Sequence, residues 1–406
     1  LQGNEWYLYE DNFSSRTGNA YIGTKTLAID PQNSNHVYVG SRTGLYEFMS
    51  GKMIAYYNKD NSILQSAIDK GRELDNNYVL TYGLSYDKEG NLWILNSQTK
   101  KENLIRLSKD GQMTSFSKDA LMENGVGLNN LSQMHLDSHN LLWFCNDDWR
   151  KPGLFCYDPK TDKLNTYTRF VNDDGANVEL TAVHCWTEDM EGNIWIGTTA
   201  GPLMLQRSQM SDQDNYHFTQ VKVPRNDGSN LADYLLAGAN ISAIAVDGAN
   251  RKWVGTLDNG LYVLSPDALT VEEHFTTANS PLFSNEIWSI ACHPTSGEVM
   301  IGTRAGLLSY QARVSTPAAS LEISNIRVYP NPVRPNYLGN ITLDGLVADA
   351  EVRVVSADGR LVARGMSLGG SFTWDGRTVQ GERAASGVYY FYVAAQGGKQ
   401  SVVAKV

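Results

Sequence analysis

Side chains that could do acid–base or metal chemistry are few in this sequence and widely spaced. Its seven histidines stand at positions 36, 135, 139, 184, 217, 274 and 293. His135 and His184 fall within apolar, strand-like runs that we expect to be innermost in the fold, where they could line a channel. A histidine in such a run more often satisfies a hydrogen bond of the core, and that structural role is the expectation for both.

Two acidic pairs offer oxygen ligands for a cation. Asp147-Asp148 and Asp173-Asp174 could hold calcium, which accepts several oxygen ligands. Neither pair has the spacing of an EF-hand loop, and turns between strands are rich in Asp and Asn for local reasons. We therefore expect no resident metal and no cofactor, with calcium kept as the alternative.

Four cysteines, Cys145, Cys156, Cys185 and Cys292, form no Cys-x-x-Cys pair and have no histidine at zinc-ligand spacing. Cys145 and Cys156 have ten residues between them and could face each other across one hairpin. Buried free thiols within strands are the simpler interpretation. Cysteine usage thus leaves the redox compartment open.

Several sequence motifs of catalytic sites are absent. The chain has no phosphate-binding loop, no His-Glu-x-x-His pair and no Rossmann glycine fingerprint. An enzyme should bring carboxylate, histidine or arginine side chains together on one face, and no residues of that kind interrupt the repeats described below. We expect no catalytic residues and a protein that is not an enzyme.

Composition indicates a folded chain with many short strands. Hydrophobic residues make up 42% and aromatic residues 10% of the 406 residues, with 21 Tyr and 36 Gly. Aromatic side chains fill sheets, and Gly permits tight turns between strands. No run of about 18 apolar residues occurs, so we expect no membrane span. The start without Met or an apolar leader suggests a mature product or a fragment.

The net charge of −10 is unevenly distributed. From Ser320 onward there are nine basic and seven acidic residues, which leaves 25 basic and 37 acidic residues in the preceding part. A part with a net charge of −12 lacks the basic footprint that nucleic acid requires, so we expect no nucleic-acid partner.

A ten-residue pattern recurs along the chain. The segment 189–198, Asp-Met-Glu-Gly-Asn-Ile-Trp-Ile-Gly-Thr, returns at 87–96, 137–146 and 247–256. Each copy has Asp first and Trp seventh, which gives Trp93, Trp143, Trp195 and Trp253. Weaker copies begin at Asp30 and Pro294, so six units start 47 to 58 residues apart.

Each unit predicts four short strands. In the unit that begins near Ile241, the strands are expected at 241–246, 252–256, 262–265 and 272–277, with a Gly-Leu hairpin before the third. Four-stranded units at this period are blades of a β-propeller. The repeated Trp is then a core residue between neighbouring sheets, and its Asp fixes the preceding turn.

The last unit, which ends near Tyr310, supplies only three strands. The segment 5–9, Glu-Trp-Tyr-Leu-Tyr, is a good fourth strand for it, and this pairing would close the ring and hide two sheet edges. The expectation is a propeller over residues 1–310 with six blades, or seven if a segment upstream of Leu1 contributes.

The repeats resemble the propellers in the sensor halves of bacterial two-component regulators and in related surface proteins. The resemblance rests on Asp-x-x-Gly-Asn-x-Trp-Ile-Gly-Thr, the Gly-Leu hairpins and an Asn-Ser-x-Leu loop between units. That loop is visible at 61–64 and 279–282, and the resemblance covers most of residues 24–310.

A different pattern begins after a small, polar, Pro-containing segment at 311–320, which reads as a linker. Residues 321–406 contain short alternating strands separated by turns such as Asp358-Gly359 and Asp375-Gly376. About 85 residues with some seven strands predict a small antiparallel sandwich of the immunoglobulin type.

This C-terminal stretch resembles the type A sorting domain of type IX secretion, a system of the Bacteroidetes. Tyr-Pro-Asn-Pro at 329–332, Asp-Gly-Arg at 358–360, Trp-Asp-Gly at 374–376 and Ser-Gly-Val-Tyr-Tyr at 386–390 carry the resemblance, with the terminal run 399–406. It implies a sorting signal that includes Asn331, Pro332, Gly387, Tyr389, Tyr390, Lys399 and Val406. A fibronectin-like accessory domain without an address function is the alternative.

Together the two parts resemble the PorZ-like surface proteins of type IX secretion. The resemblance implies a non-catalytic component at the cell surface, secreted across the outer membrane. It would act in sorting and attachment of cargo, with a sortase, outer-membrane proteins and anionic lipopolysaccharide as partners. The alternative is an exported cargo of the same system, such as an adhesin or a glycan-binding propeller. An upstream second propeller would favour the first interpretation.

Overall fold

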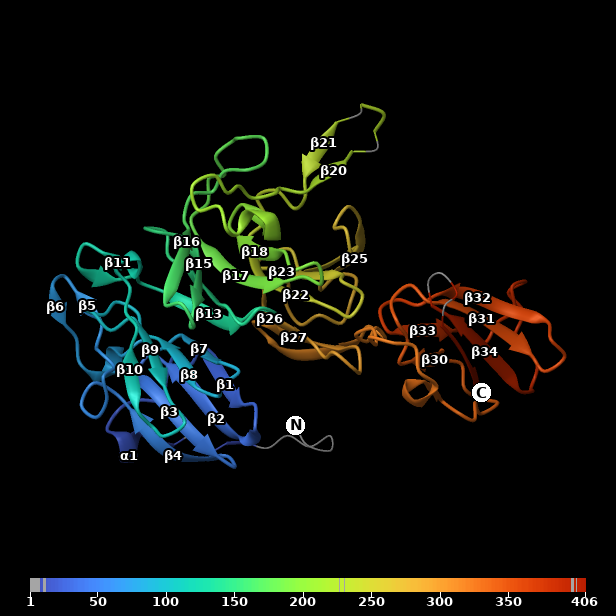
Figure 1. The fold of residues 1–406 in the computed structure, drawn as a ribbon, viewed down its shortest axis with the longest axis horizontal. Coiled ribbons are helices and arrows are strands. Elements are labelled where there is room, and N and C mark those ends of the chain that lie inside the picture. Colours follow the sequence, from blue (N-terminus) through green and yellow to red (C-terminus); the bar gives the residue numbers. More distant parts are fainter. Residues whose placement is uncertain (1–7, 10–11, 226, 230, 396–397, 399) are drawn as a thin grey trace. The chain divides into compact units, whose positions relative to one another are not determined.

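The protein is described here from a computed structural model that covers residues 8–9, 12–225, 227–229, 231–395, 398 and 400–406 (Figure 1). The chain divides into two compact units, Leu1–Gln220 with Leu236–Ile241, and Val221–Leu235 with Ser242–Val406. No helix within these described ranges is long and apolar enough to cross a membrane; the α-helix α1 (Ser14–Thr17) has four residues. The predicted all-β propeller fold is confirmed.

The first three blades are four-stranded antiparallel sheets in which each strand pairs with its neighbours in sequence. Their strands are β1 (Thr26–Asp30), β2 (Asn33–Ser41), β3 (Gly44–Met49) and β4 (Lys52–Tyr57) in blade 1; β7 (Gly83–Tyr86), β8 (Leu92–Leu95), β9 (Leu104–Leu107) and β10 (Met113–Ser115) in blade 2; β13 (Leu131–Leu136), β14 (Leu142–Asn146), β15 (Gly153–Asp158) and β16 (Lys163–Tyr167) in blade 3.

Blades 4 and 6 have three regular strands each, and blade 5 has four. In blade 4, Thr219 and Met204 exchange both backbone hydrogen bonds and so replace part of a fourth strand. The strands are β17 (Val183–Glu188), β18 (Ile194–Thr198) and β19 (Gly201–Leu205) in blade 4; β22 (Ile241–Val246), β23 (Lys252–Thr256), β24 (Leu261–Leu264) and β25 (Val271–Phe275) in blade 5; and β26 (Ile287–Cys292), β27 (Glu298–Thr303) and β28 (Gly306–Gln311) in blade 6.

The expected closing strand at 5–9 lies largely outside the described residues. Leu8 and Tyr9 are described and belong to no strand, and the Tyr9 ring packs 5.7 Å from that of Phe48. Ring closure by this segment and a seventh blade therefore stay predictions.

Short hairpins extend from the loops between the blades. They are β5 (Ile68–Asp69) with β6 (Arg72–Glu73), β11 (Met122–Glu123) with β12 (Val126–Gly127), and β20 (Lys222–Pro224) with β21 (Ala232–Tyr234). Single 3-10 turns stand at η1 (Asn76–Tyr78), η2 (Asp119–Leu121), η3 (Arg207–Gln209) and η4 (Ile323–Asn325).

The Gly-Leu hairpins have a steric cause. A Cβ atom on Gly44 would lie 2.4 Å from the carbonyl oxygen of Tyr57, and one on Gly260 would lie 2.2 Å from that of Phe275. Both glycines also have a positive φ. The end of the fourth strand thus passes against the turn that precedes the third, and only glycine leaves room for it.

The core of the propeller lies between neighbouring sheets. Between blades 3 and 4, Trp143 packs with Val183, Trp186 and Ile196, all of which are buried. Strand β14 of blade 3 and strand β18 of blade 4 are buried along their whole length, as strands without a solvent-exposed face are. This explains why the Trp-bearing strands are continuous apolar runs.

The C-terminal part is a sandwich of two antiparallel sheets, shown in orange and red in Figure 1. One sheet has the order β29-β30-β33 and the other β32-β31-β34-β35. Phe372 and Trp374 from the first sheet pack against Val352 and Phe391 from the second. The strands are β29 (Arg327–Tyr329), β30 (Ile341–Asp344), β31 (Glu351–Ser356), β32 (Leu361–Met366), β33 (Ser371–Trp374), β34 (Tyr389–Ala394) and β35 (Ser401–Lys405).

The segment 311–320, expected to be a linker, is fixed at its centre. Val314 and Ser315 are buried, at 3% and 6% exposure. The Thr316 N–H donates to the Pro294 carbonyl of blade 6 at 2.7 Å, and the Ser315 carbonyl accepts from the Gly370 N–H of the sandwich at 2.7 Å. Blades 5 and 6 and the sandwich accordingly belong to one compact unit.

Close approach of glycines makes this packing possible. A Cβ on Gly248 of blade 5 would lie 2.2 Å from Ser315, and one on Gly369 of the sandwich would lie 2.4 Å from the Gly248 carbonyl oxygen. Ser315 is further held by Asp344, whose Oδ1 accepts from its hydroxyl at 2.5 Å. Gly248, Gly369 and Ser315, with the bonds above, form what we call the linker clamp.

Candidate functional site

The repeated Asp and Trp form one structural device in four blades. In each, the Trp Nε1–H donates to the Oδ2 of the Asp six residues earlier at 2.9 Å. The other carboxylate oxygen accepts backbone N–H groups of the turn, as Asp137 does from His139 and Leu141 at 2.8 Å. The pairs are Asp87 with Trp93, Asp137 with Trp143, Asp189 with Trp195 and Asp247 with Trp253, and these tryptophans are at most 2% exposed.

Blade 1 replaces this device by a polar network. Tyr38 stands opposite Glu47, in the register that Trp143 holds opposite Cys156 in blade 3. Glu47 is 9% exposed, accepts from the Tyr57 hydroxyl at 2.7 Å and lies 2.8 Å from His36 Nε2. His36 Nδ1 lies 3.2 Å from Asp30. Burial, with the Glu47 charge, raises the pKa of Tyr38 and of Tyr57.

Sequence reasoning missed this network. The available signal was the loss of Trp at Tyr38; the charge of Glu47 is a weaker signal, because Arg106 holds the corresponding position opposite Trp93. The network satisfies a buried carboxylate. Every polar contact it makes is internal to blade 1, so it is a stabilising element and offers no open site.

His135 has the structural role that was expected. Its ring stacks on the Trp186 indole with centroids 3.8 Å apart and planes 9° apart. Desolvation lowers its pKa to about 4, so the ring is neutral near pH 7. The Trp186 Nε1–H donates to the Gln133 carbonyl at 2.7 Å, which fastens blade 4 to the irregular part of β13.

His184 is the extra residue of a β-bulge in β17, because the pairing with β18 shifts between Val183 and Cys185. Its Nδ1 lies 2.8 Å from Asp147 Oδ1 and its Nε2 2.9 Å from Asn240 Oδ1. Burial opposes the charge, but the Asp147 carboxylate and Asn240 outweigh it and raise the pKa of His184. This histidine joins blade 3 to the segment before blade 5.

The acidic pairs considered for calcium are committed to other bonds. Asp147 pairs with His184, and Asp148 makes two bonds with Arg150, at 3.0 and 3.1 Å. Asp173 accepts a backbone N–H from Gln220 at 3.3 Å. Within the described part of the chain, neither pair gathers a third His, Cys, Asp or Glu at metal-ligand distance.

One group has ligand atoms close enough for a metal: Asp137, His139 and Glu188, within 4.8 Å of one another. Its atoms are already occupied. Glu188 accepts the backbone N–H and hydroxyl of Ser138, both at 2.7 Å, and Asp137 holds the turn and Trp143. His139 Nε2 lies 2.6 Å from an Arg207 nitrogen, and that guanidinium would repel a cation. The residues do not fit a metal.

All four cysteines are free. In the β14–β15 hairpin, Cys145 lies opposite Leu154 and Cys156 opposite Trp143, so the two cysteines do not face each other. The possible bridge across this hairpin is therefore wrong. Burial raises the pKa of the Cys145, Cys156 and Cys292 thiols, which makes them poor nucleophiles.

The sequence contains a Gly-x-Ser-x-Gly pattern at 365–369, which is the form of a serine-hydrolase elbow and which sequence reasoning missed. Its Ser367 lies in the sandwich and is 5% exposed. The hydroxyl donates to the Val347 carbonyl and accepts the Ala350 N–H, both at 2.8 Å. Ser367 thus closes a turn, and its oxygen is not presented to a substrate.

A cationic and aromatic cluster stands at the edge between blades 1 and 2. Lys25 Nζ lies 4.6 Å from the centre of the Tyr82 ring, and the Arg42 guanidinium lies 5.2 Å from that of Tyr78. Arg42 Nε is buried and has no hydrogen-bond partner among the described residues. Neither cation has an ion-pair partner in the part of the chain that the structure describes, so in an acidic domain they form a local anion-attracting surface.

The residues proposed as a sorting signal gather partly at one end of the sandwich. Asn331 donates to the Lys405 carbonyl at 3.0 Å, and Tyr389 and Val406 exchange both backbone bonds at 3.0 Å. Tyr390 stands opposite Lys405. Pro332 follows Asn331, Gly387 is exposed in the preceding loop, and Lys399 lies outside the described residues.

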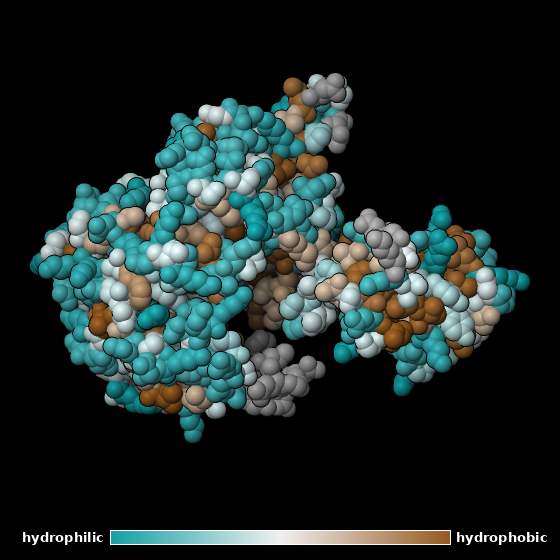
Figure 2. Space-filling model, viewed as in Figure 1, coloured by the Kyte–Doolittle hydropathy of each residue, from teal (hydrophilic) through white to brown (hydrophobic). Residues whose placement is uncertain are grey.

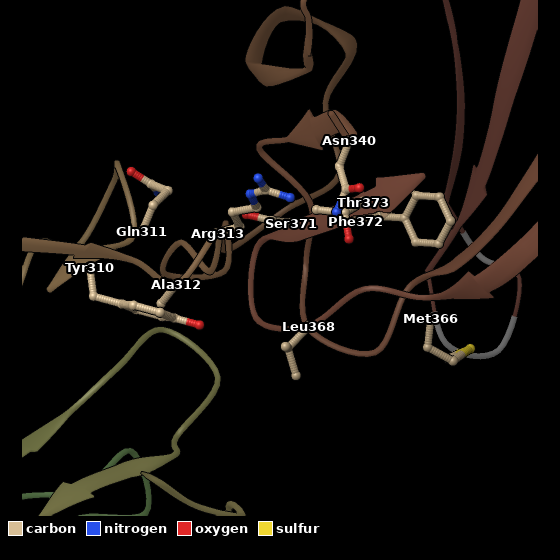
Figure 3. A pocket seen from close by; sticks show the side chains of 10 residues that line it. All are labelled: Tyr310, Gln311, Ala312, Arg313, Asn340, Met366, Leu368, Ser371, Phe372 and Thr373. Carbon is tan, nitrogen blue, oxygen red and sulfur yellow. The ribbon is translucent and has the colours of Figure 1, made fainter. Parts of the chain in front are cut away.

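A cleft of about 610 Å³ opens beside the linker clamp, between blade 6 and the sandwich. Figure 3 shows Arg313 and Asn340 on one side of it and Leu368 and Met366 on another. Arg313 is the one charged residue of this lining. The cleft has room for a small ligand, but no second charged group converges on it.

Comparison with known proteins supports the propeller and part of the resemblance. A family model described as two component regulator propeller matches residues 179–200, within blade 4. No curated protein matches the sequence. The structure is similar to that of PorZ from Porphyromonas gingivalis, at 26% identity and a TM-score of 0.66, over 94% of this chain and 51% of that one.

PorZ is described as an essential bacterial surface component of the type IX secretion system. This chain spans about half of its length. Two more distant similarities are to an extracellular domain described as that of a one component system from B. thetaiotaomicron (12% identity, TM-score 0.47, 94% of this chain and 50% of that one) and to virginiamycin B lyase from Staphylococcus aureus (10%, 0.45, 72% and 86%).

Proposed function

We propose that this chain is a non-catalytic surface component of a type IX secretion apparatus that acts in the sorting and attachment of cargo. The observation that carries the proposal is the similarity to PorZ, which extends over 94% of this chain. This coverage is larger than the share of the chain taken by residues 1–310, which supports a common arrangement of propeller and terminal sandwich. The proposed location is the cell surface, after secretion across the outer membrane.

The linker clamp favours an apparatus component over cargo. A cargo protein whose sorting domain is removed needs an accessible, extended junction before that domain. Here Val314 and Ser315 are buried, Ser315 is bonded to the sandwich and Thr316 is bonded to blade 6. A sandwich held in this way is suited to remain on the protein. Exported cargo, such as a glycan-binding propeller, is the second candidate.

The proposed partners are the sortase and outer-membrane proteins of the apparatus. The end of the sandwich formed by Asn331, Tyr389 and Val406 would be their point of recognition. Figure 2 shows hydrophobic side chains on the visible face of the sandwich. Tyr392 and Val403 are two of the exposed apolar residues of the sandwich as a whole. Exposed apolar groups of this kind suit protein recognition.

Anionic lipopolysaccharide is the proposed glycan partner. Its phosphate groups would be repelled by the acidic propeller in general, so contact requires a local cationic surface. Lys25 and Arg42 provide one, and the exposed ring of Tyr78 beside Arg42 can contact sugar. The proposal assigns no bond breaking to the chain, since the reactive side chains described above hold structural bonds.

Deletion of the gene tests the proposal. Other proteins that carry a type IX sorting domain should then fail to reach the cell surface and should accumulate inside the cell. Restoring the gene should restore their export. Normal surface display of those proteins in the deletion strain would assign this chain to the cargo and overturn the proposal.

A further inference from the structure

Blade 6 presents an aromatic side chain where its sheet is irregular. The pairing of β26 with β27 shifts between Ile287 and Ser289, which makes Trp288 the extra residue of a β-bulge. A bulge re-aims the side chain it carries. Ile287 is fully buried, whereas Trp288 is 57% exposed. The bulge therefore turns a large indole out of the sheet and into solvent.

Two charged side chains fix the edge of this indole. The Trp288 Nε1–H donates to Glu286 Oε1 at 3.0 Å, and Arg304 donates to Glu286 Oε2 at 3.1 Å. The Arg304 backbone N–H also donates to the Glu286 carbonyl at 3.0 Å. The bonds from Trp288 and Arg304 lower the pKa of Glu286, so the carboxylate is charged near pH 7. The ring is held by its polar edge, and its faces stay free for contact.

A second exposed ring lies at the same turn. Phe283 is 59% exposed and lies over Gly306, where an added Cβ would be 3.3 Å from the Phe283 ring. Gly306 and Arg304 belong to the same β27–β28 turn. Phe283, Glu286, Trp288 and Arg304 thus border one hairpin turn; we call them the blade 6 platform.

The bulge in blade 4 carries a different kind of residue. There the extra residue is His184, which is bound to Asp147 and Asn240 within the protein. In blade 5, the Ser242 hydroxyl donates a hydrogen bond to the Ile287 carbonyl at 2.5 Å. Among the described residues, an exposed indole at a bulge with its N–H bound to a carboxylate is found in blade 6, and the fold itself does not demand it.

We propose that the blade 6 platform binds a saccharide. An indole face is apolar and matches the C–H face of a pyranose ring, which stacks on it. The Glu286 carboxylate accepts hydrogen bonds and the Arg304 guanidinium donates them, so together they suit neighbouring sugar hydroxyls. The site is separate from the Lys25 and Arg42 cluster and does not depend on a role in secretion.

Side-chain NMR tests this site directly. The full chain is labelled with ¹⁵N at its tryptophan indoles, and the Trp288 cross-peak is assigned by its loss in Trp288→Phe. Maltohexaose, cellohexaose, mannohexaose and N-acetylglucosamine are then titrated in turn. At least one of them should shift the Trp288 cross-peak in a saturable way. In Glu286→Gln, the affinity for that sugar should fall about tenfold or more.

Trp149 supplies a matched control. It is 72% exposed and lies beside Arg150, which pairs with Asp148, but among the described residues its indole N–H is not bound to a carboxylate as that of Trp288 is. Its cross-peak should not move. Equal shifts at Trp149 and Trp288, or none at Trp288 with any sugar, overturn the proposal. A Trp288 cross-peak that moves with protein concentration alone would assign the surface to a second copy of the chain and also overturn it.

Discussion

The Nε1–H of Trp93 donates to Oδ2 of Asp87 at 2.9 Å, and the same bond, at the same length, is present in blades 3, 4 and 5. Asp87 also accepts the Asn91 backbone N–H at 2.8 Å. One carboxylate therefore fixes both the turn and the core residue that follows it, which couples local chain direction to packing between blades.

Asp87→Ala should destabilise the chain by roughly 2–4 kcal/mol, because a buried indole N–H and a turn N–H lose a charged acceptor. Urea denaturation followed by tryptophan fluorescence measures this. Asp110→Ala, at an exposed turn of the same blade, is the control and should lower the stability far less. Equal effects of the two substitutions would contradict the role given to Asp87.

The linker clamp predicts resistance to proteases. Gly369→Ala places a Cβ about where the Gly248 carbonyl lies, so it should loosen the clamp and speed cleavage within 311–320 about tenfold or more. Limited proteolysis with mass spectrometry locates the cut. Gly359→Ala is a matched control, since that glycine also has a positive φ but would meet nothing within 4 Å. Rapid cleavage of the unaltered chain at 311–320 would show that the clamp does not protect the linker.

His184 predicts a pH dependence of stability. Its pKa is raised in the folded protein, so its bonds to Asp147 and Asn240 stabilise the fold fully below the unfolded value, about pH 6.5. That contribution is lost as pH rises through the raised pKa. The difference in unfolding free energy between the unaltered chain and His184→Gln should therefore be larger at about pH 5.5 than at about pH 9. A difference that grows with pH would contradict this sign.

The Lys25 and Arg42 cluster predicts salt-dependent glycan binding. The double variant Lys25→Gln, Arg42→Gln should lose about tenfold or more in affinity for purified phosphate-bearing lipopolysaccharide, and the affinity of the unaltered chain should fall with added salt. Surface plasmon resonance measures both. Lys88→Gln, an exposed cation on a turn of blade 2, should bind like the unaltered chain. Binding that is indifferent to both the substitutions and the salt would exclude this cluster.

The repeat predicted the blades because the six-residue spacing from Asp to Trp corresponds to one hydrogen bond between residues close in sequence. The strand around Trp253, expected at 252–256, is found as Lys252–Thr256. Local spacing carries no information on Glu47, since its partners His36 and Tyr57 lie on other strands and the network depends on cross-strand register.

The fixed position of the linker was also hard to predict, because its residue types suit a flexible segment as well as a packed one. Small polar residues such as Ser315 are typical of flexible segments, yet the backbone of Ser315 lies directly against Gly248 and Gly369. The exposure of Trp288 depends on a bulge in β26, which no residue pattern in that strand indicates.

The linker clamp changes how the molecule responds to a pulling force. Tension applied at the C-terminal strand would pass through Ser315 into the edge of the last blade and would not be absorbed by the extension of a flexible linker. The sandwich and that blade would then carry the force together, so whatever binds the C-terminal strand also pulls on blade 6.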